Sequence, residues 1–495
     1  MPDTEPKSDT IAAISTPPGR GGIGIVRLSG SESASIATQL VRLRQPLEHA
    51  HARLADVLDE PGEGSDSLRV DEALVTFFAK PHSYTAEDLV EIAAHGSPVV
   101  LELLLRRAIV LGARLAEPGE FTQRAFLSGR IDLTQAEAVR DLIDAQTLTQ
   151  ARQAASQMGG ALSRRVAPAK QMLVELIALL EAGIDFAEDD VDVTPQAEIA
   201  RRIDELTAPL TGLEASFTRG RIVHDGLTLA IVGRPNAGKS SLFNRLVERD
   251  RAIVTATPGT TRDLVTERIS LGGIPLELVD TAGLREAREE AEQLGIARSR
   301  EALADAALVL IVLDATQPLN EEERRLLAAV EGRPALVAIN KSDLANCSDE
   351  KNYFDDQLKD PASSVRDAGL SVKGTGLSPY IHAAPEVADR AHIPALATSA
   401  LTGQGIADLR ERILALATGG AGAESGLLTN LRQHQAVASA LAALGDAGRA
   451  NASSIPHEMI LLDLYRALWA LDSLTGQTTP DDILNLIFST FCIGK

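Results

Sequence analysis

The stretch that decides the fold is GRPNAGKSS, residues 233–241, which has the form G-x-x-x-x-G-K-S. This pattern is typical of a glycine-rich loop whose backbone N–H groups cradle phosphates while its lysine reaches the β- and γ-phosphates. The apolar run LTLAIV (227–232) precedes the loop, and SLFNRLVE (241–248) follows it with helical apolar spacing. Because strand, loop and helix come in the required order, the sequence predicts a nucleotide-binding unit.

Composition limits the class of protein. The chain has 495 residues, 44% of them hydrophobic and 24% charged, which is typical of a folded protein of about three domains. No apolar run approaches the roughly 20 residues of a membrane helix, and the N-terminus MPDTEPKSDT is acidic and polar. The two cysteines, Cys347 and Cys492, fit neither a disulfide framework nor a zinc site. We therefore expect a cytoplasmic protein with no membrane association.

The net charge of -21 argues against a surface that binds nucleic acid unaided, since such binding depends on Lys and Arg neutralising phosphates. This net charge does not exclude a local basic patch on the surface.

Four zones of the chain differ in their apolar pattern. Residues 1–130 have short apolar runs broken by Gly and Pro, with one clear helix at 98–111, and predict an α+β domain. Residues 131–220 and 421–495 have helical periodicity, whereas strand-like and helix-like runs alternate over 221–420. The predicted fold class is a multidomain α/β and α protein, in which a parallel-sheet P-loop domain is inserted into one helical domain whose halves pack together.

Polar motifs follow the expected strands of the 221–420 domain. DTAG (280–283) follows PLELV, NKSD (340–343) follows ALVAI, and SAL (399–401) follows PALAT. Ligands of open α/β sheets bind at the carboxyl ends of the strands. An Asp after a buried strand can hold the Mg²⁺ shell, while the carboxylate of NKSD accepts two hydrogen bonds from guanine and so favours GTP over ATP.

The segment TPGTTRD (257–263) would supply a hydroxyl to Mg²⁺, with Thr261 as the candidate beside Ser240 of the loop. SAL would offer a backbone N–H to the guanine carbonyl. Together the motifs resemble those of the translation-factor class of P-loop GTPases, with Lys239 also taking a catalytic role. The residues expected to bind GTP are Asn236, Ala237, Gly238, Lys239, Ser240, Ser241, Thr255, Ala256, Thr257, Pro258, Gly259, Thr260, Thr261, Asp280, Thr281, Ala282, Gly283, Asn340, Lys341, Asp343, Ser399, Ala400 and Leu401.

The residue after DTAG is Leu284, where Ras-like enzymes have a glutamine that orients the attacking water. A leucine cannot orient water, so another group must do so. The segment REAREEAEQLG (285–295) offers several acids, Glu286, Glu289, Glu290 and Glu292, any of which could instead face solvent on a helix.

Asn236 suggests how the transition state is stabilised. Its amide oxygen, with the backbone carbonyls of Thr255, Thr257 and Thr260, could hold a K⁺ where other GTPases place an arginine finger. The alternative is that Asn236 only braces the loop through side-chain hydrogen bonds.

The N-terminal PPGRGGIGIVRLSG (17–30) contains a formal G-x-G-x-x-G, but IVRLSG predicts a strand where a dinucleotide fold needs a helix. This run belongs to a wider set that includes PHSYTAEDLVEIAAHG (81–96), PGEFTQRAFLSGRIDLTQAEAV (118–139) and FCIGK (491–495). With the GTPase motifs, these segments resemble the tRNA-modification GTPase family MnmE (TrmE) over nearly the whole chain.

The resemblance implies a dimerising N-terminal domain similar to folate-binding one-carbon enzymes, and a K⁺-activated GTPase that works by G-domain dimerisation. It implies a flavin-dependent partner, MnmG (GidA), forming a heterotetramer that adds a carboxymethylaminomethyl-type group to C5 of the wobble uridine of certain tRNAs. The family's water-orienting glutamate corresponds to Glu292, and its contacts to a tetrahydrofolate derivative correspond to Arg27, Glu91, Arg130 and Lys495. Arg27 and Arg130 could pair with folate carboxylates and Glu91 with the pterin, or these residues could form ordinary salt bridges.

The chain departs from the family pattern between NKSD and SAL, where residues 344–398 include a polar surface insertion. A ribosome-assembly GTPase is the alternative function, although the sequence has no second phosphate loop. A folate-binding scaffold with an inactive G domain is disfavoured because Lys239, Ser240, Thr261 and Asp280 are all present.

Overall fold

The computed structural model describes residues 9–59, 68–185, 194–247, 265–280, 306–344, 393–418, 426–477 and 494. The contacts between residues divide the chain into two compact units. The first comprises Met1–Ile143, Ala154–Gly212 and Arg432–Lys495, and the second comprises Asp144–Gln153 and Leu213–Leu431.

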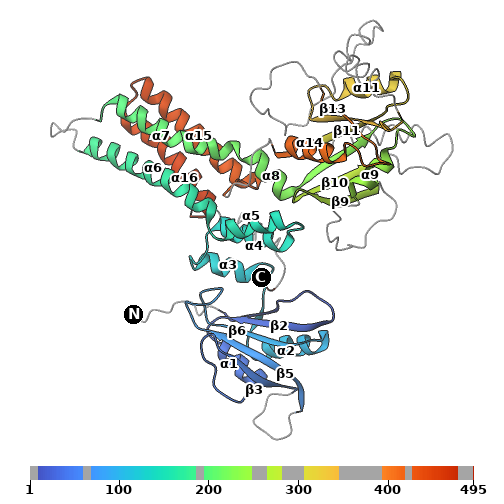
Figure 1. Ribbon diagram of the computed structural model, residues 1–495. Coiled ribbons are helices and arrows are strands. Elements are labelled where there is room, and N and C mark those ends of the chain that lie inside the picture. The colour runs from blue at the N-terminus through green and yellow to red at the C-terminus, as the bar shows by residue number, and fades with distance from the viewer. Residues whose placement is uncertain are drawn as a thin grey trace, which may run out of the picture. The chain divides into compact units, whose positions relative to one another are not determined.

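A seven-stranded sheet forms the N-terminal part of the first unit, in the order β3-β4-β5-β6-β2-β1-β7 (Figure 1). Neighbouring strands are antiparallel except β1 and β7. Two helices cover one face of this sheet and bury its main hydrophobic core. The elements are β1 (Ile11–Ile14), β2 (Gly21–Ser29), α1 (Ser33–Leu40), β3 (Val41–Leu43), β4 (Ala52–Leu58), β5 (Arg69–Phe78), β6 (Leu89–Gly96), α2 (Pro98–Val110) and β7 (Arg114–Leu115).

The glycine-rich run near the N-terminus leads into strand β2, which confirms the rejection of a dinucleotide-binding turn and helix. Its apolar side chains alternate, so that Val26 and Leu28 enter the core. A Cβ at Gly24 would lie 2.4 Å from Leu101 Cδ1. Gly24 therefore allows helix α2 to pack closely on the strand.

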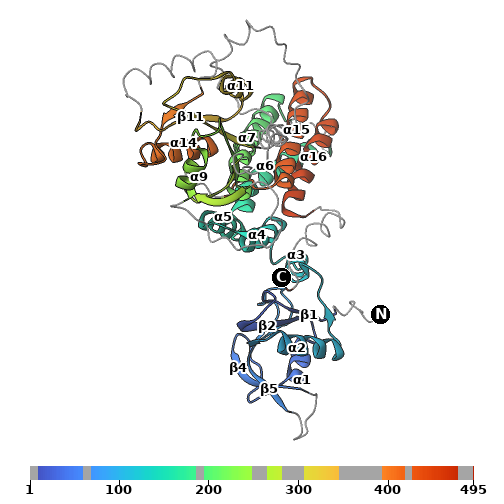
Figure 2. The ribbon, with the colours of Figure 1, turned by 90° about the vertical axis from the view of Figure 1, so that its right-hand side faces the viewer.

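The rest of the first unit is helical. Figures 1 and 2 show α6, α7, α15 and α16 running alongside one another. Hydrogen bonds join α6 and α7 to the helices α15 and α16, which come much later in the sequence. Tyr465 Oη donates to Glu181 Oε1 at 2.5 Å, and Asn451 Nδ2 donates to Gln196 O at 2.9 Å. The helices are α3 (Glu120–Leu127), α4 (Leu133–Asp144), α5 (Leu148–Met158), α6 (Ala161–Asp185), α7 (Gln196–Ala215), α15 (Leu431–Ala452) and α16 (His457–Thr475). Helices α4, α5, α7 and α15 contribute residues to both units.

One partly buried ion pair connects three of these helices. Arg432, near the start of α15, donates from Nε and Nη2 to the two carboxylate oxygens of Glu137 on α4 at 2.6 and 2.9 Å. The same guanidinium donates to the carbonyls of Ser473 and Leu474 in the last turn of α16. Arg432 thus caps α16 and holds α15 against α4.

The second unit contains a six-stranded sheet in the order β13-β12-β11-β8-β10-β9. Helices α9 and α14 pack on one face of the sheet and α11 on the other, and the side chains between helices and sheet are buried. Figure 1 shows these helices beside the sheet. The elements are α8 (Phe217–Asp225), β8 (Leu227–Val232), α9 (Lys239–Val247), β9 (Val265–Leu271), β10 (Ile274–Asp280), β11 (Leu308–Asp314), α11 (Glu321–Ala329), β12 (Ala335–Asn340), β13 (Ala395–Ala397) and α14 (Ile406–Thr418).

The sheet of the second unit is parallel, as expected, except at one edge. Strand β9 pairs antiparallel with β10 across a two-residue turn. The turn residues Gly272 and Gly273 have φ of +57° and +86°, the positive values that a tight hairpin requires and glycine adopts without strain. This Gly-Gly pair between two strand-like runs was the sequence signal for the hairpin.

The expected fold class, with α+β, helical and P-loop α/β parts, is confirmed. Among the described helices, none is both long enough and apolar enough to cross a membrane.

Candidate functional site

The phosphate loop joins β8 to α9, and close contacts explain its two end glycines. Gly233 has a φ of +146°, and a Cβ there would lie 2.2 Å from the carbonyl oxygen of Val312 on β11. Gly238 has a φ of +92°, and its Cβ would lie 2.1 Å from Asn340 Nδ2. Any larger residue would collide with the neighbouring strand ends, so the loop lies directly against β11 and β12.

Lys239 begins helix α9 and folds back over the loop. Its ammonium group donates to the carbonyls of Gly233 at 2.6 Å and Arg234 at 2.8 Å, and the residue is 7% exposed. The helix N-terminus places backbone N–H groups and a partial positive charge at the loop. The lysine and this helix end provide the positive field that a triphosphate needs.

Asn236 and Ser240 are both exposed on this loop. Asn236 has a φ of +67°, in the left-handed region that Asn tolerates better than most residues. An amide oxygen and a hydroxyl oxygen, both at the surface of the loop, are suitable donors for hard cations.

Asn340 bridges the loop to the SAL motif. Its Nδ2 donates to Ala237 O at 2.9 Å, and its Oδ1 accepts from the Ala400 N–H at 3.0 Å. The side chain is 2% exposed, so it braces the phosphate side and the base side of the site. Of the backbone N–H groups expected in SAL, that of Ala400 donates to Asn340 in this structure.

Lys341 and Asp314 form a second brace. Lys341 has a φ of +64°, and its Nζ donates to Asp314 Oδ2 at 2.7 Å. Burial would raise the pKa of Asp314, but hydrogen bonds from Lys341 and Thr316 outweigh it and lower the pKa. The sequence reasoning assigned Asp314 no role, although an acid at the carboxyl end of a buried strand beside NKSD was a signal for one.

Asp343 is exposed at the end of the NKSD motif. Within the described part of the chain, its carboxylate has no hydrogen bond or ion pair to other residues. Both carboxylate oxygens of Asp343 are thus exposed to solvent as hydrogen-bond acceptors, which is what recognition of the guanine N–H groups requires. Ser399, by contrast, is fully buried and its Oγ accepts from the Thr402 N–H at 3.1 Å, which shapes the SAL turn.

Several expected site residues lie outside the described residues. At Asp280 only the backbone, which ends strand β10, is described. Those outside are Thr255, Ala256, Thr257, Pro258, Gly259, Thr260, Thr261, Thr281, Ala282, Gly283, Glu292 and Lys495, together with Cys492 and residues 345–392 of the insertion.

A second group of expected residues meets on the N-terminal sheet. Arg27 on β2 lies opposite Glu91 on β6 in the strand register, and donates to its Oε1 from Nε at 2.9 Å and Nη2 at 2.7 Å. The ion-pair alternative is therefore present.

Tyr84 connects Arg27 to Arg130. Its ring centroid lies 5.6 Å from the guanidinium carbon of Arg27 and 5.4 Å from that of Arg130, and Arg130 Nη1 donates to Tyr84 O at 2.6 Å. Burial raises the pKa of the Tyr84 phenol, so the hydroxyl stays protonated when it bonds Thr122 Oγ1. Such ring contacts favour the cationic groups. The sequence reasoning quoted this tyrosine within PHSYTAED without giving it a role.

The C-terminal tail reaches this group at Gly494. Its carbonyl accepts from Ser15 Oγ at 3.0 Å and from Arg27 Nη1 at 3.2 Å. Gly494 has a φ of +95°, and a Cβ would lie 2.6 Å from Ile14 O. Only glycine therefore fits against strand β1 at this position.

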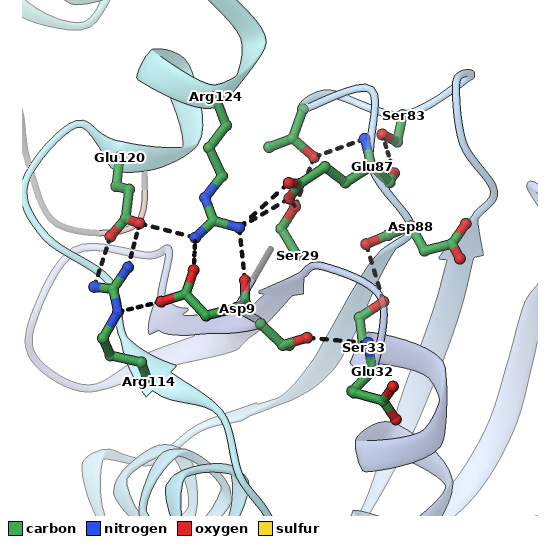
Figure 3. A network of polar contacts seen from close by, with 12 residues as sticks. Asp9, Ser29, Glu32, Ser33, Ser83, Glu87, Asp88, Arg114, Glu120 and Arg124 are labelled. Atoms are coloured by element: carbon green, nitrogen blue, oxygen red, sulfur yellow. Dashed lines mark hydrogen bonds and ion pairs between the residues drawn. The ribbon is translucent and has the colours of Figure 1, made fainter. Parts of the chain in front are cut away.

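A separate ionic network braces the same domain (Figure 3). The guanidinium of Arg124 contacts the carboxylates of Asp9, Glu87 and Glu120 at 2.7, 3.0 and 3.0 Å. Arg114 also pairs with Glu120 at 2.6 Å. Each charged side chain in this group has at least one partner of opposite charge, which indicates a structural role. No periodic signal in the sequence predicted it.

The sequence is similar to those of known proteins over nearly its whole length. Residues 10–130 match the family model of the GTP-binding protein TrmE N-terminus, and residues 133–492 match that of the MnmE helical domain. A tRNA modification GTPase MnmE of Koribacter versatilis (strain Ellin345) is 56% identical, covering 98% of this chain and 99% of that protein. Proteins of the same name from Roseiflexus sp. (strain RS-1) and Chloroflexus aurantiacus are each 40% identical, over 98% and 99% of this chain and 99% and 100% of their own lengths.

Proposed function

This chain belongs to the MnmE family of tRNA modification GTPases, as its motifs predicted, and we propose that it acts on the wobble uridine of certain tRNAs. With a flavin-dependent partner, MnmG, it would add a carboxymethylaminomethyl-type group to C5 of that base. One observation carries the proposal beyond GTP hydrolysis. The tail carbonyl of Gly494 bonds Arg27, so the C-terminus converges with Glu91 and Arg130 on a site that GTP binding does not need.

The residues of the phosphate loop fit a Mg²⁺–GTP complex. Lys239 and the first turn of α9 would bind the phosphates, Ser240 with Thr261 would hold Mg²⁺, and Asp343 would recognise guanine. The exposed carboxylate of Asp343 and the positive end of α9 support this assignment. The bound Mg²⁺ would neutralise phosphate charge, while Asn340 keeps the loop and the SAL turn together.

We propose that K⁺ activates the GTPase through Asn236. The exposed, left-handed Asn236 supports a ligand role, and the carbonyls of Thr255, Thr257 and Thr260 would complete the oxygen set. A fixed K⁺ would stabilise negative charge that develops between the phosphates. Glu292 would orient the attacking water in place of the missing glutamine.

Turnover of GTP in KCl and in NaCl tests the ion. Wild-type turnover is expected to be at least about tenfold faster in K⁺, and Asn236→Ala should lose the difference. Equal rates in both salts would exclude a K⁺ requirement. Glu292→Gln should lower kcat with little change in KM, since its effect is confined to the reacting water.

The Arg27, Glu91, Arg130 and Lys495 group is our candidate site for a tetrahydrofolate derivative, which would supply the one-carbon unit. Arginines pair well with carboxylates, and a carboxylate accepts hydrogen bonds from a pterin. The two guanidiniums flanking Tyr84 support this chemistry. Calorimetric titration with 5-formyltetrahydrofolate should show binding that Arg130→Gln weakens. Arg106→Gln, which breaks the exposed Arg106–Glu102 pair on α2, is the matched control and should bind as the wild type does.

We propose a homodimer that joins MnmG in a heterotetramer in the cytoplasm. Leu54 on β4 and Leu74 on β5 lie directly opposite each other and are 40% and 50% exposed, which supports contact with a second copy. Light scattering should give a dimer mass for the wild type and a monomer for Leu74→Glu. A monomeric wild type would count against the assembly.

A further inference from the structure

Glu323 is the least exposed carboxylate among the described residues, at 1%, and it belongs to none of the GTPase motifs. It is the third residue of α11. Asn320 Oδ1 accepts from the Glu323 N–H at 2.8 Å, and Glu323 Oε2 accepts from the Asn320 N–H at 3.0 Å. This reciprocal capping box starts the helix. It uses only one of the two carboxylate oxygens.

The other oxygen reaches the phosphate loop. Glu323 Oε1 lies 3.2 Å from Nε of Arg234, the second residue of the loop, whose side chain is 12% exposed. Among the described residues, neither Nη2 of Arg234 nor Oε1 of Glu323 has a hydrogen-bond partner, although both atoms are buried. The ion pair with Glu323 therefore anchors this guanidinium, and a buried charge that loses its partner is costly.

Arg234 is held from its other side as well. Its carbonyl oxygen accepts a hydrogen bond from Lys239 Nζ at 2.8 Å. Lys239 therefore contacts the backbone of Arg234, and Glu323 contacts its side chain. Because the lysine must face the phosphates, the position of Arg234 affects where the ammonium group lies. Movement of the Arg234 side chain would loosen the loop on which Lys239 rests.

We propose that Arg234 and Glu323 are positioning residues for GTP, and that the N-terminus of α11 holds the phosphate loop in its nucleotide-binding form. Neither side chain need touch the reacting atoms. The pair restricts the phosphate loop before nucleotide binds, so that the loop loses less conformational entropy on binding. Its loss weakens nucleotide binding more than it slows the chemical step.

The experiment measures dissociation of a fluorescent GDP, mant-GDP, from the full-length protein by stopped flow, and steady-state GTP turnover. Arg234→Gln and Glu323→Gln should each raise the dissociation rate and KM about tenfold, within the coupling range known for contacting residues. The expected change in kcat at saturating GTP is smaller than threefold. The amide oxygen that Glu323→Gln introduces can still accept the Asn320 N–H, so α11 keeps its cap.

The double variant, which combines Arg234→Gln and Glu323→Gln, shows whether the two residues act through their shared contact or independently of each other. Because both changes break the same contact, the double variant should dissociate no more than about twofold faster than the more affected single variant. Arg234→Lys should recover part of the affinity. Arg325→Gln, which removes the exposed Arg325–Glu321 pair on the same helix, should leave dissociation at the wild-type rate.

Wild-type dissociation in Arg234→Gln overturns the proposal, as do single effects that multiply in the double variant. A fall in kcat with unchanged KM also overturns it, since the pair would then act on the chemical step. Should Glu323→Gln fail to fold, the comparison of Arg234→Gln with Arg234→Lys decides the question. Equal rates in those two variants would contradict a charge-paired anchor.

Discussion

Replacing Gly238 with alanine tests the geometry of the nucleotide site. The new Cβ would lie 2.1 Å from Asn340 Nδ2, so Asn340 must move and lose its hydrogen bonds to Ala237 O and the Ala400 N–H. Each buried hydrogen bond contributes about 1 kcal/mol. A residue with a side chain at a φ of +92° adds about 1–2 kcal/mol of backbone strain. The total is about 3–4 kcal/mol.

The loop can escape this strain by leaving its binding conformation, which nucleotide binding must then restore. We therefore expect the dissociation constant of mant-GDP to rise by about two to three orders of magnitude, since 1.4 kcal/mol is tenfold. Fluorescence titration measures the constant, and thermal unfolding verifies the fold.

Gly332→Ala is the matched control. Gly332 has a φ of +79°, but no atom lies within 4 Å of its Cβ position, so this variant has the strain without the collision and should bind normally. In an Asn340→Ala background, Gly238→Ala should weaken binding far less than in the wild type. Near-normal affinity of Gly238→Ala, or an equal loss in Gly332→Ala, would refute the reasoning.

Three further predictions concern recognition and stability. Asp343→Asn should lower affinity for GTP by about 2 kcal/mol or more and favour XTP in competition titrations, because the new amide can donate to the C2 carbonyl of xanthine; unchanged preference would contradict guanine recognition by this carboxylate. Arg432→Met removes the ion-pair partner of Glu137 and leaves the Gln433 amide as its hydrogen-bond donor among the described residues. This variant should destabilise the first unit by about 3 kcal/mol in urea unfolding, a loss that Glu137→Gln in the same chain should reduce. Hydrogen bonds to Arg114 lower the pKa of Asp9, and contacts of Glu120 with Arg114 and Arg124 outweigh its burial and lower its pKa below 4.5. Because these pKa values are depressed by folding, their stabilisation is present above pH 4.5 and is lost as pH falls below it; thermal unfolding between pH 7 and pH 3 should show a smaller acid loss in Arg124→Met.

The sequence predicted the nucleotide-binding strands well because long buried runs end in polar motifs. Strand β12 ends at Asn340 of NKSD, and β8 has the predicted limits 227–232. Strand β9 was missed because VTERISL is an edge strand with no polar motif at its end. Its identity depends on the Gly272–Gly273 turn and on pairing with β10.

Side-chain partners were harder to predict because they depend on register and direction. Arg27 and Glu91 are 64 positions apart and meet only because β2 and β6 pair in one register. Asn340 was expected to bind nucleotide, and the motif alone did not reveal that its amide braces Ala237 and Ala400. No local pattern connected Glu323 with Arg234.

Analysis of the wobble uridine in cellular tRNA tests the proposed function most directly. tRNA from cells lacking this gene would be digested and its nucleosides compared by mass spectrometry with those from cells that carry the wild-type gene. We expect the C5 carboxymethylaminomethyl-type modification to disappear and to return with the wild-type gene but not with Lys239→Ala. Unchanged wobble nucleosides in the deletion strain would contradict the proposed function.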